Sequence, residues 1–425
     1  MIRAVKGTRD LLPPATTAWN YVESVARKVF HAYNYREIRT PILEETQLFA
    51  RGVGEETDIV TKEMYTFEDR DKTSLTLRPE NTAGVMRAYI EHRLDQQPGV
   101  QKLYYMGPMF RRERPQKGRY RQFYQIGAEA IGSESPATDA EVIEMVVEIL
   151  ARSGLKDFKV LLNSVGDHKC RPVFIAKLRE ELAGVADKLC VDCQRRAVTN
   201  PLRVLDCKVA ADQSIIDQLP SILDYLCETC RPHFEAVQKH LSDRRIVYEV
   251  KPRLVRGLDY YMRTTFEVVH SALGAQNSVL GGGRYDGLAE MLDSKVPAPG
   301  IGFSIGEDRL VMAVEESLSA NELDVVIVSL GEAALAYAEE LARALRNNHI
   351  SVELATAGKL KRLIELADKL KALNAVIIGD NEIATGKYVL RNMHTGEQDT
   401  VSPSEICNRM KPLGKPWGEP WGPAW

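Results

Sequence analysis

The chain has 425 residues, which is too long for a single hydrophobic core and favours two or three domains. Hydrophobic residues make up 44% of it and charged residues 27%, a composition that excludes a disordered or collagen-like chain. The formal net charge of −3 excludes a uniformly basic nucleic-acid coat, although a local basic groove is compatible with it. The sequence shows no apolar run of the ~20 residues that a membrane span needs and no signal-peptide stretch at its start, so we expect a cytoplasmic protein.

The N-terminal region begins with a predicted helix followed by an extended segment. After Pro13 and Pro14, apolar side chains recur at helical spacing. These side chains are Trp19, Val22, Ala26, Val29 and Tyr33. Residues 37–43 then have the pattern of a strand. Because Pro41 cannot donate a backbone hydrogen bond, we expect this strand to lie at a sheet edge or to end at Pro41.

Short strands dominate the chain up to about residue 310. Strands are predicted at residues 64–67, 74–77, 103–110, 121–131, 158–163, 253–270 and 278–280, and helices at 139–153 and from about 308. This pattern predicts an antiparallel α+β core rather than a doubly wound sheet. Residues from about 167 to 240 are instead helical, charged and cysteine-bearing, which indicates a helical insertion.

The pattern changes again after residue 320. Strands at 325–329, 351–354 and 375–378 alternate with helices at 332–347 and 359–371, which is typical of a small α/β domain with a largely parallel sheet. We therefore expect domains at 1–320 and 321–412. A tail at 413–425, rich in Pro, Gly and Trp, offers no periodic face to bury, and we expect it to be flexible.

An arginine-rich segment, residues 110–121, lies between two predicted strands. A solvated hairpin loop is the alternative to a functional role. On the returning strand, alternation places Phe123, Gln125, Gly127 and Glu129 on one face and Tyr124, Ile126, Ala128 and Ala130 on the other. The second face is core, whereas the first has the features of a pocket floor. An arginine-rich loop above it suits a polyphosphate whose base stacks on Phe123.

Two further segments place polar side chains among apolar ones. In residues 75–84, Thr76, Arg78 and Glu80 project to one side of an expected strand, and a surface Arg–Glu pair is the alternative. In residues 253–261, Arg256 stands just before a glycine amid apolar residues, which argues against a solvated surface position. The adjacent tyrosines that follow it are expected on opposite sides of a strand.

Two glycine-rich segments complete the set. Residues 281–287 read Gly-Gly-Gly-Arg-Tyr-Asp-Gly, where glycines allow close backbone approach to a ligand and a plain turn is the alternative. Residues 300–310 read as a strand that runs into a helix opening with acids and Arg309. This last segment is neither a Walker loop nor a dinucleotide fingerprint.

The seven cysteines favour reduced thiols over a disulfide framework, because their number is odd and no secretion signal precedes them. Four of them form two Cys-x-x-Cys pairs, Cys190 with Cys193 and Cys227 with Cys230. Two such pairs suit one tetrahedral zinc ion, although the gap between them exceeds the usual spacing. Four reduced thiols on insertion helices are the alternative.

The five chemistry-bearing segments, in this order, closely resemble those of class II aminoacyl-tRNA synthetases, specifically the histidyl-tRNA synthetase family. The helix and strand ending at Pro41 resemble motif 1, which builds the dimer interface of the class. Residues 110–129 resemble motif 2, and residues 302–309 resemble motif 3. Residues 254–261 and 282–287 match the histidine-specific signatures, and the resemblance extends from residue 7 to about 409.

The resemblance implies a fold and an activity. The fold is the class II antiparallel-sheet catalytic core with a helical insertion, plus a C-terminal α/β anticodon-binding domain. The activity is that of a cytoplasmic, homodimeric histidine–tRNA ligase, which uses ATP, L-histidine and tRNA(His) in protein biosynthesis. One alternative is the catalytically inactive paralogue that regulates ATP phosphoribosyltransferase, but it typically lacks the C-terminal domain and degrades the arginine motifs. Another class II synthetase is the second alternative, and it lacks the histidine-specific segments.

The resemblance also implies roles for individual residues. Arg111 would contact the α-phosphate and the amino-acid carboxylate, Arg256 would act at the same phosphate, and Arg309 would clamp the far phosphates. Histidine binding is implied for Glu80, Thr82, Arg111, Gln125, Glu129, Arg256, Tyr260 and Tyr261. ATP binding with Mg²⁺ is implied for Arg111, Glu113, Arg119, Phe123, Asp308 and Arg309, with Phe123 stacking on adenine.

Three details complete these expectations. Glu113 and Gln116 lie in the loop that meets the tRNA acceptor end in this class. Asp308 stands where many members carry glutamate, which shortens a metal ligand but keeps its charge. In the anticodon-binding domain the candidate phosphate contacts are Lys359, Lys361 and Arg362, and an ordinary solvated helix start is the alternative for each.

Overall fold

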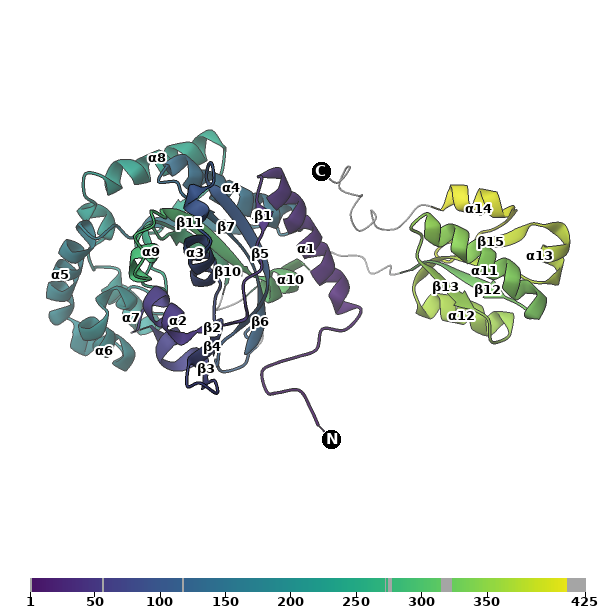
Figure 1. Ribbon diagram of the computed structural model, residues 1–425, viewed down its shortest axis with the longest axis horizontal. Helices are drawn as coiled ribbons and strands as arrows, with labels where there is room; N and C mark the ends of the chain where they lie inside the picture. Colours follow the sequence, from purple (N-terminus) through teal and green to yellow (C-terminus); the bar gives the residue numbers. More distant parts are fainter. Residues whose placement is uncertain are drawn as a thin grey trace. The chain divides into compact units, whose positions relative to one another are not determined.

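The structure is a computed structural model that describes residues 2–55, 57–116, 118–271, 273, 277–314 and 323–410. The chain divides into two compact units (Figure 1). The larger unit includes Ala18–Ser317, and the smaller unit includes Leu318–Trp425. The predicted tail at 413–425 lies outside the described residues.

The larger unit is built around a central sheet with the strand order β1-β5-β6-β11-β10-β9-β7-β8. The bounds are β1 Arg36–Glu37, β5 Gln101–Phe110, β6 Gln122–Ile131, β7 Phe158–Ser164, β8 Glu249–Val250, β9 Met262–His270, β10 Ser278–Arg284 and β11 Gly300–Gly306. Neighbouring strands are antiparallel except at the two edges, where β1 pairs with β5 and β8 with β7 in parallel. The predicted antiparallel core is confirmed.

A second sheet, β2-β4-β3, lies beside the central one and explains the role of Pro41. Its bounds are β2 Leu43–Glu45, β3 Tyr65–Glu68 and β4 Ser74–Leu77. Residues 37–43 do not form one strand, because β1 ends at Glu37 in the central sheet and β2 begins at Leu43 in the second. The expected edge position is confirmed, since β1 and β2 are each an edge strand of their sheet. Pro41 lies in the crossing between the sheets, where a missing backbone N–H costs no ladder bond.

Helices cover the face of the central sheet that was predicted to be core. Helix α1 (Ala15–Ala32) packs there, with the ring of Trp19 5.3 Å from Tyr124 and the ring of Phe30 4.5 Å from Tyr104. Ile126 has no exposed surface on the same face of β6. Helix α4 (Pro136–Arg152) contacts β11. The assignment of the two faces of β6 from alternation is therefore confirmed for its core side.

The remaining helical segments of the larger unit are short. The bounds are α2 Thr46–Val53, η1 Ile59–Glu63, α3 Thr82–Glu91, η2 Leu94–Gln96, α9 Leu288–Met291 and α10 Glu307–Val314. The insertion predicted at about 167–240 contains α5 Cys170–Ala183, η3 Ala186–Lys188, α6 Val191–Thr199, η4 Pro201–Val204, α7 Ala210–Ile216, η5 Ile222–Tyr225 and α8 Cys230–Asp243. Figure 1 shows these helices in teal along one side of the unit.

The smaller unit is a sheet between helices, with the strand order β13-β12-β14-β15-β16. The bounds are β12 Leu323–Ser329, α11 Glu332–Asn347, β13 Val352–Ala355, α12 Leu360–Lys369, β14 Ala372–Ile378, α13 Asp380–Thr385, β15 Tyr388–Asn392, β16 Gln398–Val401 and α14 Pro403–Arg409. The predicted parallel pairing holds for β13, β12 and β14, whereas β15 and β16 are antiparallel.

Successive side chains of β12 point to opposite faces of the sheet and pack in the two hydrophobic cores of this unit. Val325 and Ile327 pack in one core with residues of α11 such as Leu341. Val326 and Val328 pack in the other core with residues of α12. Because apolar side chains on both faces need cover, a helix on each face is the expected solution.

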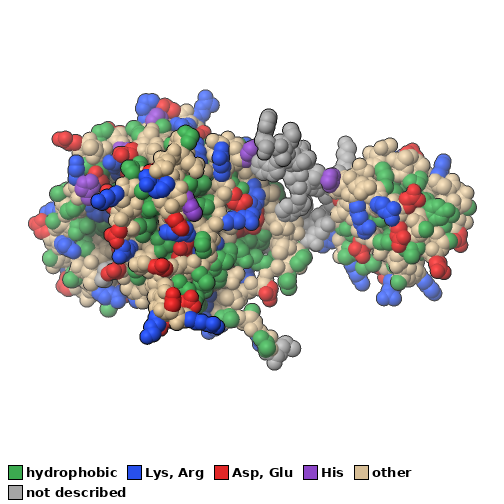
Figure 2. All heavy atoms as spheres, viewed as in Figure 1, with side chains coloured by type: hydrophobic (Ala, Val, Ile, Leu, Met, Phe, Trp, Pro, Cys, Tyr) green, Lys and Arg blue, Asp and Glu red, His purple; other side chains and the backbone are tan. Residues whose placement is uncertain are grey.

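Charged side chains of both signs are spread over the surface. On the face seen in Figure 2, Lys and Arg side chains are interspersed with Asp and Glu on each unit. Within the described ranges, no helix has the length and apolar character needed to cross a bilayer.

The first residue of α10 predicts a measurable dependence of stability on pH. Glu307 has no exposed surface, and burial, followed by the nearby charges of Glu23 and Asp308, raises the pKa of its carboxyl well above the ordinary value. The protonated Glu307 therefore contributes to folding stability below about pH 4.5, the pKa of the unfolded state. This contribution is lost as the pH rises through the higher pKa of the folded state. Glu307→Gln is therefore expected to raise the melting temperature, and more so at about pH 8 than at about pH 5.

The control for this experiment is Glu290→Gln, a change at an exposed carboxylate of the same unit. Thermal unfolding followed by circular dichroism at both pH values measures the difference. A gain for Glu307→Gln that does not grow with pH would contradict the assignment.

Candidate active site in the larger unit

A cavity of about 530 Å³ opens on the face of the central sheet that carries Phe123 and Gln125, opposite the face covered by α1. Segments far apart in the chain line it. The predicted site residues among them are Glu80, Thr82, Arg111, Glu113, Arg119, Phe123, Gln125, Arg256, Tyr260, Tyr261, Asp308 and Arg309. Gln116, which is exposed, and Glu129, which is fully buried, are not among the lining residues. The structure thus brings most of the predicted site into one place.

Arg111 and Arg256 enter this cavity from distant segments. Arg111 follows the last residue of β5, and its Nε donates to the carbonyl oxygen of Pro79 at 2.9 Å. Its guanidinium lies over the ring of Phe123, 5.2 Å from the centroid. Arg256 comes from the connection between β8 and β9, and its Nη1 donates to Oε2 of Glu267 at 3.0 Å.

The position of Arg256 depends on a neighbouring glycine. A Cβ at Gly281, in β10, would overlap the Arg256 guanidinium. Burial by itself would lower the pKa of Arg256, but the fields of Tyr261 and Glu267 outweigh it and raise that pKa. Arg256 is therefore held as a cation against the glycine-rich strand.

Arg309 faces the same cavity from α10. Its Nη1 donates to the carbonyl oxygen of Ser278 at 2.7 Å, and its Nε donates to that of Gly118 at 3.4 Å. Burial, and then the positive charge of Arg119, lower its pKa. Arg119 itself pairs with Glu113 at 2.9 Å. Clustered guanidinium groups that disfavour one another's charge suit a polyanionic ligand, which would relieve this repulsion.

Asp308, predicted as a shortened metal ligand, already has two partners. Its Oδ1 pairs with Nη2 of Arg9 at 2.6 Å, and its Oδ2 accepts the backbone N–H of Tyr124 at 3.0 Å. Burial raises the pKa of its carboxyl, while the Tyr124 N–H and Arg9 oppose that rise. In this arrangement Asp308 ties the N-terminal segment and β6 to α10.

Glu80 lies at the N-terminus of α3, and this contradicts part of the sequence prediction. The strand predicted at 74–77 is confirmed as β4, but its alternation does not continue to Glu80, because Pro79 and the start of α3 at Thr82 interrupt it. The Glu80 carboxylate accepts the backbone N–H groups of Thr82 at 2.8 Å and of Ala83 at 3.0 Å. Burial raises the pKa of Glu80, and the two N–H groups and Arg111 oppose the rise.

Arg78 is a structural residue rather than half of a surface pair. It is buried, as is Glu80. Its Nε donates to the carbonyl oxygen of Pro108 at 3.0 Å, and its Nη1 donates to Oγ1 of Thr40 at 2.9 Å. Arg78 thus joins the β4–α3 connection to β5 and to the crossing that contains Pro41.

Only the second half of the strand predicted over 253–270 is confirmed. Residues 253–261 form turns instead, and β9 begins at Met262. Asn163 holds this stretch through its Nδ2, which donates to the carbonyl oxygens of Pro252 at 3.1 Å and Leu254 at 2.9 Å. The rings of Tyr260 and Tyr261 are both buried with centroids 4.7 Å apart, so they do not face opposite sides of a strand. The hydroxyl of Tyr260 donates to Oε2 of Glu80 at 3.4 Å.

Glu129 lies behind the cavity wall. Its Oε1 accepts the Thr82 hydroxyl at 2.8 Å and the Tyr105 hydroxyl at 3.4 Å, and its Oε2 accepts the Tyr285 hydroxyl at 2.7 Å. Burial raises its pKa to about 8, although these hydroxyls oppose the rise. Thr82 and Tyr105 line the cavity, so Glu129 positions them from the inside. A Cβ at Gly302 would overlap its carboxylate, which explains that glycine of β11.

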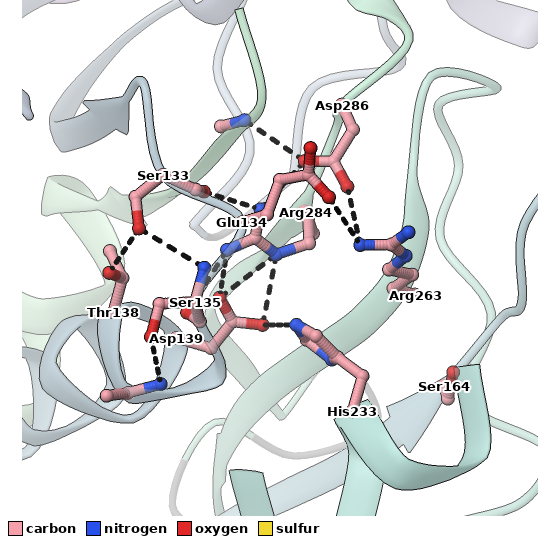
Figure 3. Close-up of polar contacts among 12 residues, drawn as sticks. Ser133, Glu134, Ser135, Thr138, Asp139, Ser164, His233, Arg263, Arg284 and Asp286 are labelled. Carbon is pink, nitrogen blue, oxygen red and sulfur yellow. Dashed lines mark hydrogen bonds and ion pairs between the residues drawn. The ribbon is translucent and has the colours of Figure 1, made fainter. Parts of the chain in front are cut away.

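The segment 281–287 is neither a ligand loop along its whole length nor a plain turn. It forms most of β10, where a Cβ at Gly282 would come 2.5 Å from the carbonyl oxygen of Gly302. Arg284 is fully buried and pairs with Asp139 at 2.5 Å and Asp286 at 2.8 Å. Its Nη1 also donates to the carbonyl oxygen of Ser133 at 2.8 Å. Figure 3 shows Arg284 at the centre of this network, which joins β10 to the start of α4.

Sequence reasoning missed several cavity residues. Glu267 was detectable in principle, because it is a charged side chain between the apolar residues Phe266 and Val268 of β9. Tyr105 on β5 and the insertion residues Arg203, Asp206 and Lys208 also line the cavity. No local sequence pattern indicates that these residues line the cavity. The three insertion residues reach it only through the packing of the insertion.

The expectation of one zinc site built from both Cys-x-x-Cys pairs is wrong. Cys190 and Cys193 lie with Cys207 and Asp212, whereas Cys227 and Cys230 lie with Asp167 and Cys170. Cys190 and Cys193 lie at the start of α6, whereas Cys227 and Cys230 lie at the start of α8. All seven cysteines fall within the described residues, and each is a free thiol.

Comparison with known proteins identifies the family to which the chain is similar. The sequence profile described as histidyl-tRNA synthetase matches residues 7–310, and the profile described as anticodon binding domain matches residues 324–413. The histidine–tRNA ligase of Solibacter usitatus is 73% identical over 96% of this chain and 99% of its own length, and that of Koribacter versatilis is 56% identical over 96% and 95%.

The solved structures agree with the sequence matches. The crystal structure of apo Staphylococcus aureus histidyl-tRNA synthetase superimposes with a TM-score of 0.78 at 40% identity, covering 96% of this chain and all of that one. The class II catalytic core with a C-terminal anticodon-binding domain is therefore confirmed as the fold. Matched in sequence and in structure over nearly its whole length, the chain belongs to the histidyl-tRNA synthetase family.

Proposed function

We propose that the chain is a histidine–tRNA ligase. It activates L-histidine with ATP to histidyl-adenylate and pyrophosphate, and then transfers histidine to the 3′ end of tRNA(His) with release of AMP. The observation that carries the proposal is that Arg111 and Arg256, from distant segments, line one cavity together with Arg309. The regulatory paralogue has no observation in its favour, because the arginine-bearing motifs and the C-terminal unit are both present.

The first step is governed by charge and position rather than by a base. The histidine carboxylate is ionised near neutral pH, since α-carboxyls titrate at about 3.5, and it attacks the α-phosphorus as the bond to pyrophosphate breaks. Like-charge repulsion between the reactants is the main obstacle. Arg111 would hold the carboxylate and the α-phosphate together, and Arg256 would stabilise the charge that grows at phosphorus. Arg309 would clamp the far phosphates.

ATP recognition uses the other side of the same cavity. Phe123 would stack on adenine, with Arg119 and Glu113 beside it and Asp308 fixing α10 below. The Mg²⁺ that accompanies ATP fits this lining, since Mg²⁺ binds through one or two carboxylates plus substrate phosphates and Glu113 presents such a group. When bound, the ion would neutralise charge on the β- and γ-phosphates.

Histidine recognition requires a partner for each imidazole nitrogen, because an unpaired buried donor costs ~1–3 kcal/mol. Glu80 and the hydroxyls of Tyr260 and Tyr261 supply acceptors and donors at the cavity wall. Gln125 offers a further hydrogen-bond acceptor, because its Oε1 is buried in the wall without a hydrogen-bond partner among the described residues. Thr82 lines the wall, and Glu129 would act through Thr82 and Tyr105.

Transfer to tRNA follows from the same arrangement. The terminal ribose hydroxyl attacks the adenylate carbonyl, and the bond to AMP breaks. Gln116 is exposed in the loop above the cavity, where the acceptor end would approach. Lys359, Lys361 and Arg362 are exposed at the start of α12 and would contact anticodon phosphates. We also propose a homodimer that assembles through the segment ending at Pro41 and works in the cytoplasm.

Pyrophosphate exchange tests the proposal. Purified protein is expected to exchange labelled pyrophosphate into ATP when histidine is present, and not when it is replaced by any other standard amino acid. Absence of exchange would favour the regulatory paralogue. Exchange with another amino acid would instead assign the chain to a different class II specificity.

Gly281→Ala is expected to lower histidine-dependent exchange without removing any of the cavity's functional side chains. The added Cβ would overlap the guanidinium of Arg256, which is the far end of a flexible side chain and must move away. A displacement on the order of 1 Å at a reacting centre can lower a rate about 100-fold, so we expect a loss of roughly 10- to 100-fold. Exchange at saturating ATP and histidine measures it.

Gly184→Ala is the matched control for this change. Gly184 follows α5 and is exposed, and an added Cβ there would have its nearest neighbour, the Glu181 carbonyl oxygen, at 3.6 Å. Its activity should equal that of the parent protein. Unchanged exchange in Gly281→Ala would mean that Arg256 need not rest against β10.

A further inference from the structure

Two clusters of thiols and carboxylates lie in the insertion, apart from the proposed active site. Cluster A consists of Cys190, Cys193, Cys207 and Asp212, and cluster B consists of Asp167, Cys170, Cys227 and Cys230. In each cluster the four ligand atoms all lie within 4.8 Å of one another. These are the groups of this kind found among the described residues, and the ligase chemistry uses none of their members.

Cluster A has the spacing of a tetrahedral site. The Sγ atoms of Cys190 and Cys207 are 3.9 Å apart, and Sγ of Cys207 is 3.3 Å from Oδ2 of Asp212. Zinc–sulfur bonds of about 2.3 Å at tetrahedral angles place two sulfurs about 3.8 Å apart. Cys193, fully buried in the first turn of α6, completes the set.

Backbone N–H groups surround the ligands of cluster A. The N–H of Val209 points at Sγ of Cys207 at 3.4 Å. The N–H of Cys190 points at both oxygens of Asp212, at 3.2 and 3.1 Å. Such outer donors are the usual supports of metal-bound thiolates and carboxylates, because they orient the ligand and share its negative charge.

Cluster B joins the starts of α5 and α8. Oδ1 of Asp167 lies 3.4 Å from Sγ of Cys170, and both of its oxygens lie 3.7 Å from Sγ of Cys227. The N–H of Asp167 points at Sγ of Cys170 at 3.2 Å. Asp167 also accepts the N–H of Lys169 through Oδ1 at 2.9 Å. That bond orients the carboxylate beside Cys227.

The two halves of cluster B repeat the same short sequence. Residues 170–174 read Cys-Arg-Pro-Val-Phe, and residues 230–234 read Cys-Arg-Pro-His-Phe. In both copies the cysteine begins a helix and the phenylalanine is buried, so the two helices present their ligands in the same local frame. Asp167 stands three residues before the cysteine of one copy, as Cys227 stands before the cysteine of the other. The carboxylate therefore occupies the position of a ligand.

We propose that clusters A and B each bind one structural zinc ion through three thiolates and one carboxylate. Three sulfurs and one oxygen in a compact group form a tetrahedral donor set that suits zinc. Disulfides cannot account for either cluster, because three thiols leave one over. The two ions would stabilise the packing of the short helices between α5 and α8. The segment between α6 and α7 carries the cavity residues Arg203 and Lys208.

Metal analysis of full-length protein, purified under reducing conditions without a chelator, tests the proposal. We expect about two zinc ions per chain. Cys193→Ser should lose the ion of cluster A and Cys230→Ser that of cluster B, each leaving about one. Cys407→Ser is the matched control, because Cys407 is a free thiol of the smaller unit outside both clusters, and it should keep both ions.

Thiol modification of the unaltered chain tests the proposal even if the variants fail to fold. A mild thiol reagent should modify Cys407 alone, whereas a mercurial should bind the other six thiolates and release both zinc ions. Reconstitution with Co²⁺ should give tetrahedral d–d bands about twice as intense as those of either single-site variant.

Two results would overturn the proposal. Protein that neither contains zinc nor takes it up after reduction would show that the clusters are packed thiols. A single ion per chain, lost in both Cys193→Ser and Cys230→Ser, would show one shared site. Neither result bears on the ligase activity, which pyrophosphate exchange tests separately.

Discussion

Arg256→Ala is expected to lower histidine-dependent pyrophosphate exchange by about 100- to 1,000-fold while the protein remains folded. Removing one preorganised donor from a site where charge develops costs about that much in other enzymes. Arg256 is held in the cavity by Glu267 at 3.0 Å and rests against Gly281, so its guanidinium is in place before ATP arrives. The loss should appear mainly in the rate of adenylate formation at saturating substrates.

Two further variants sharpen this experiment. Arg256→Lys keeps the charge but loses the forked donor geometry, so an intermediate activity is expected. Arg253→Ala is the matched control, since Arg253 lies in the same connection and pairs with Asp217 at 3.1 Å but does not line the cavity. Exchange close to the parent level in Arg256→Ala would refute the role proposed for this side chain, provided that circular dichroism shows a native fold.

Arg284→Met is expected to lower the free energy of unfolding of the larger unit by about 3–5 kcal/mol. Arg284 and Asp139 have no exposed side-chain surface, and their ion pair spans 2.5 Å. Removing the cation leaves the fully buried carboxylate of Asp139 without its main partner. Figure 3 shows how the guanidinium also reaches the carbonyl oxygen of Ser133, so the connection into α4 should loosen as well.

Denaturant unfolding followed by circular dichroism measures this effect, with the transition of the larger unit analysed separately from that of the smaller one. Lys239→Met is the control, because the Lys239–Asp243 pair spans 2.7 Å but is exposed, with 74% and 56% of the side-chain surfaces accessible. Little change is expected there. If the two substitutions lowered the free energy of unfolding equally, burial of the Arg284 ion pair would not account for its contribution to stability.

These two arginines illustrate how far sequence reasoning reaches. Both stand in histidine-specific signatures beside glycines, and local pattern alone does not separate them. In the structure Arg256 lines the cavity, whereas Arg284 is sealed in the core with Asp139. The distinction depends on Asp139, which is 145 residues away in sequence and packs against Arg284 only when α4 folds onto the sheet.

The sequence by itself determined the antiparallel character of the central sheet, the core face of β6 and the α/β character of the smaller unit. These follow from side-chain periods of two and 3.6, which act over a few neighbouring residues. Most of the site residues that the family resemblance implies also line the cavity.

Only the tertiary structure decided the rest. Residues 253–261 form a connection rather than a strand, and Asn163 on β7 fixes its start by donating to the carbonyl oxygens of Pro252 and Leu254. The tertiary structure moved Glu129 behind the cavity wall and divided the cysteines into two clusters. In each case the deciding partner lies far along the chain, and no local period records a contact that exists only after distant helices and strands have packed.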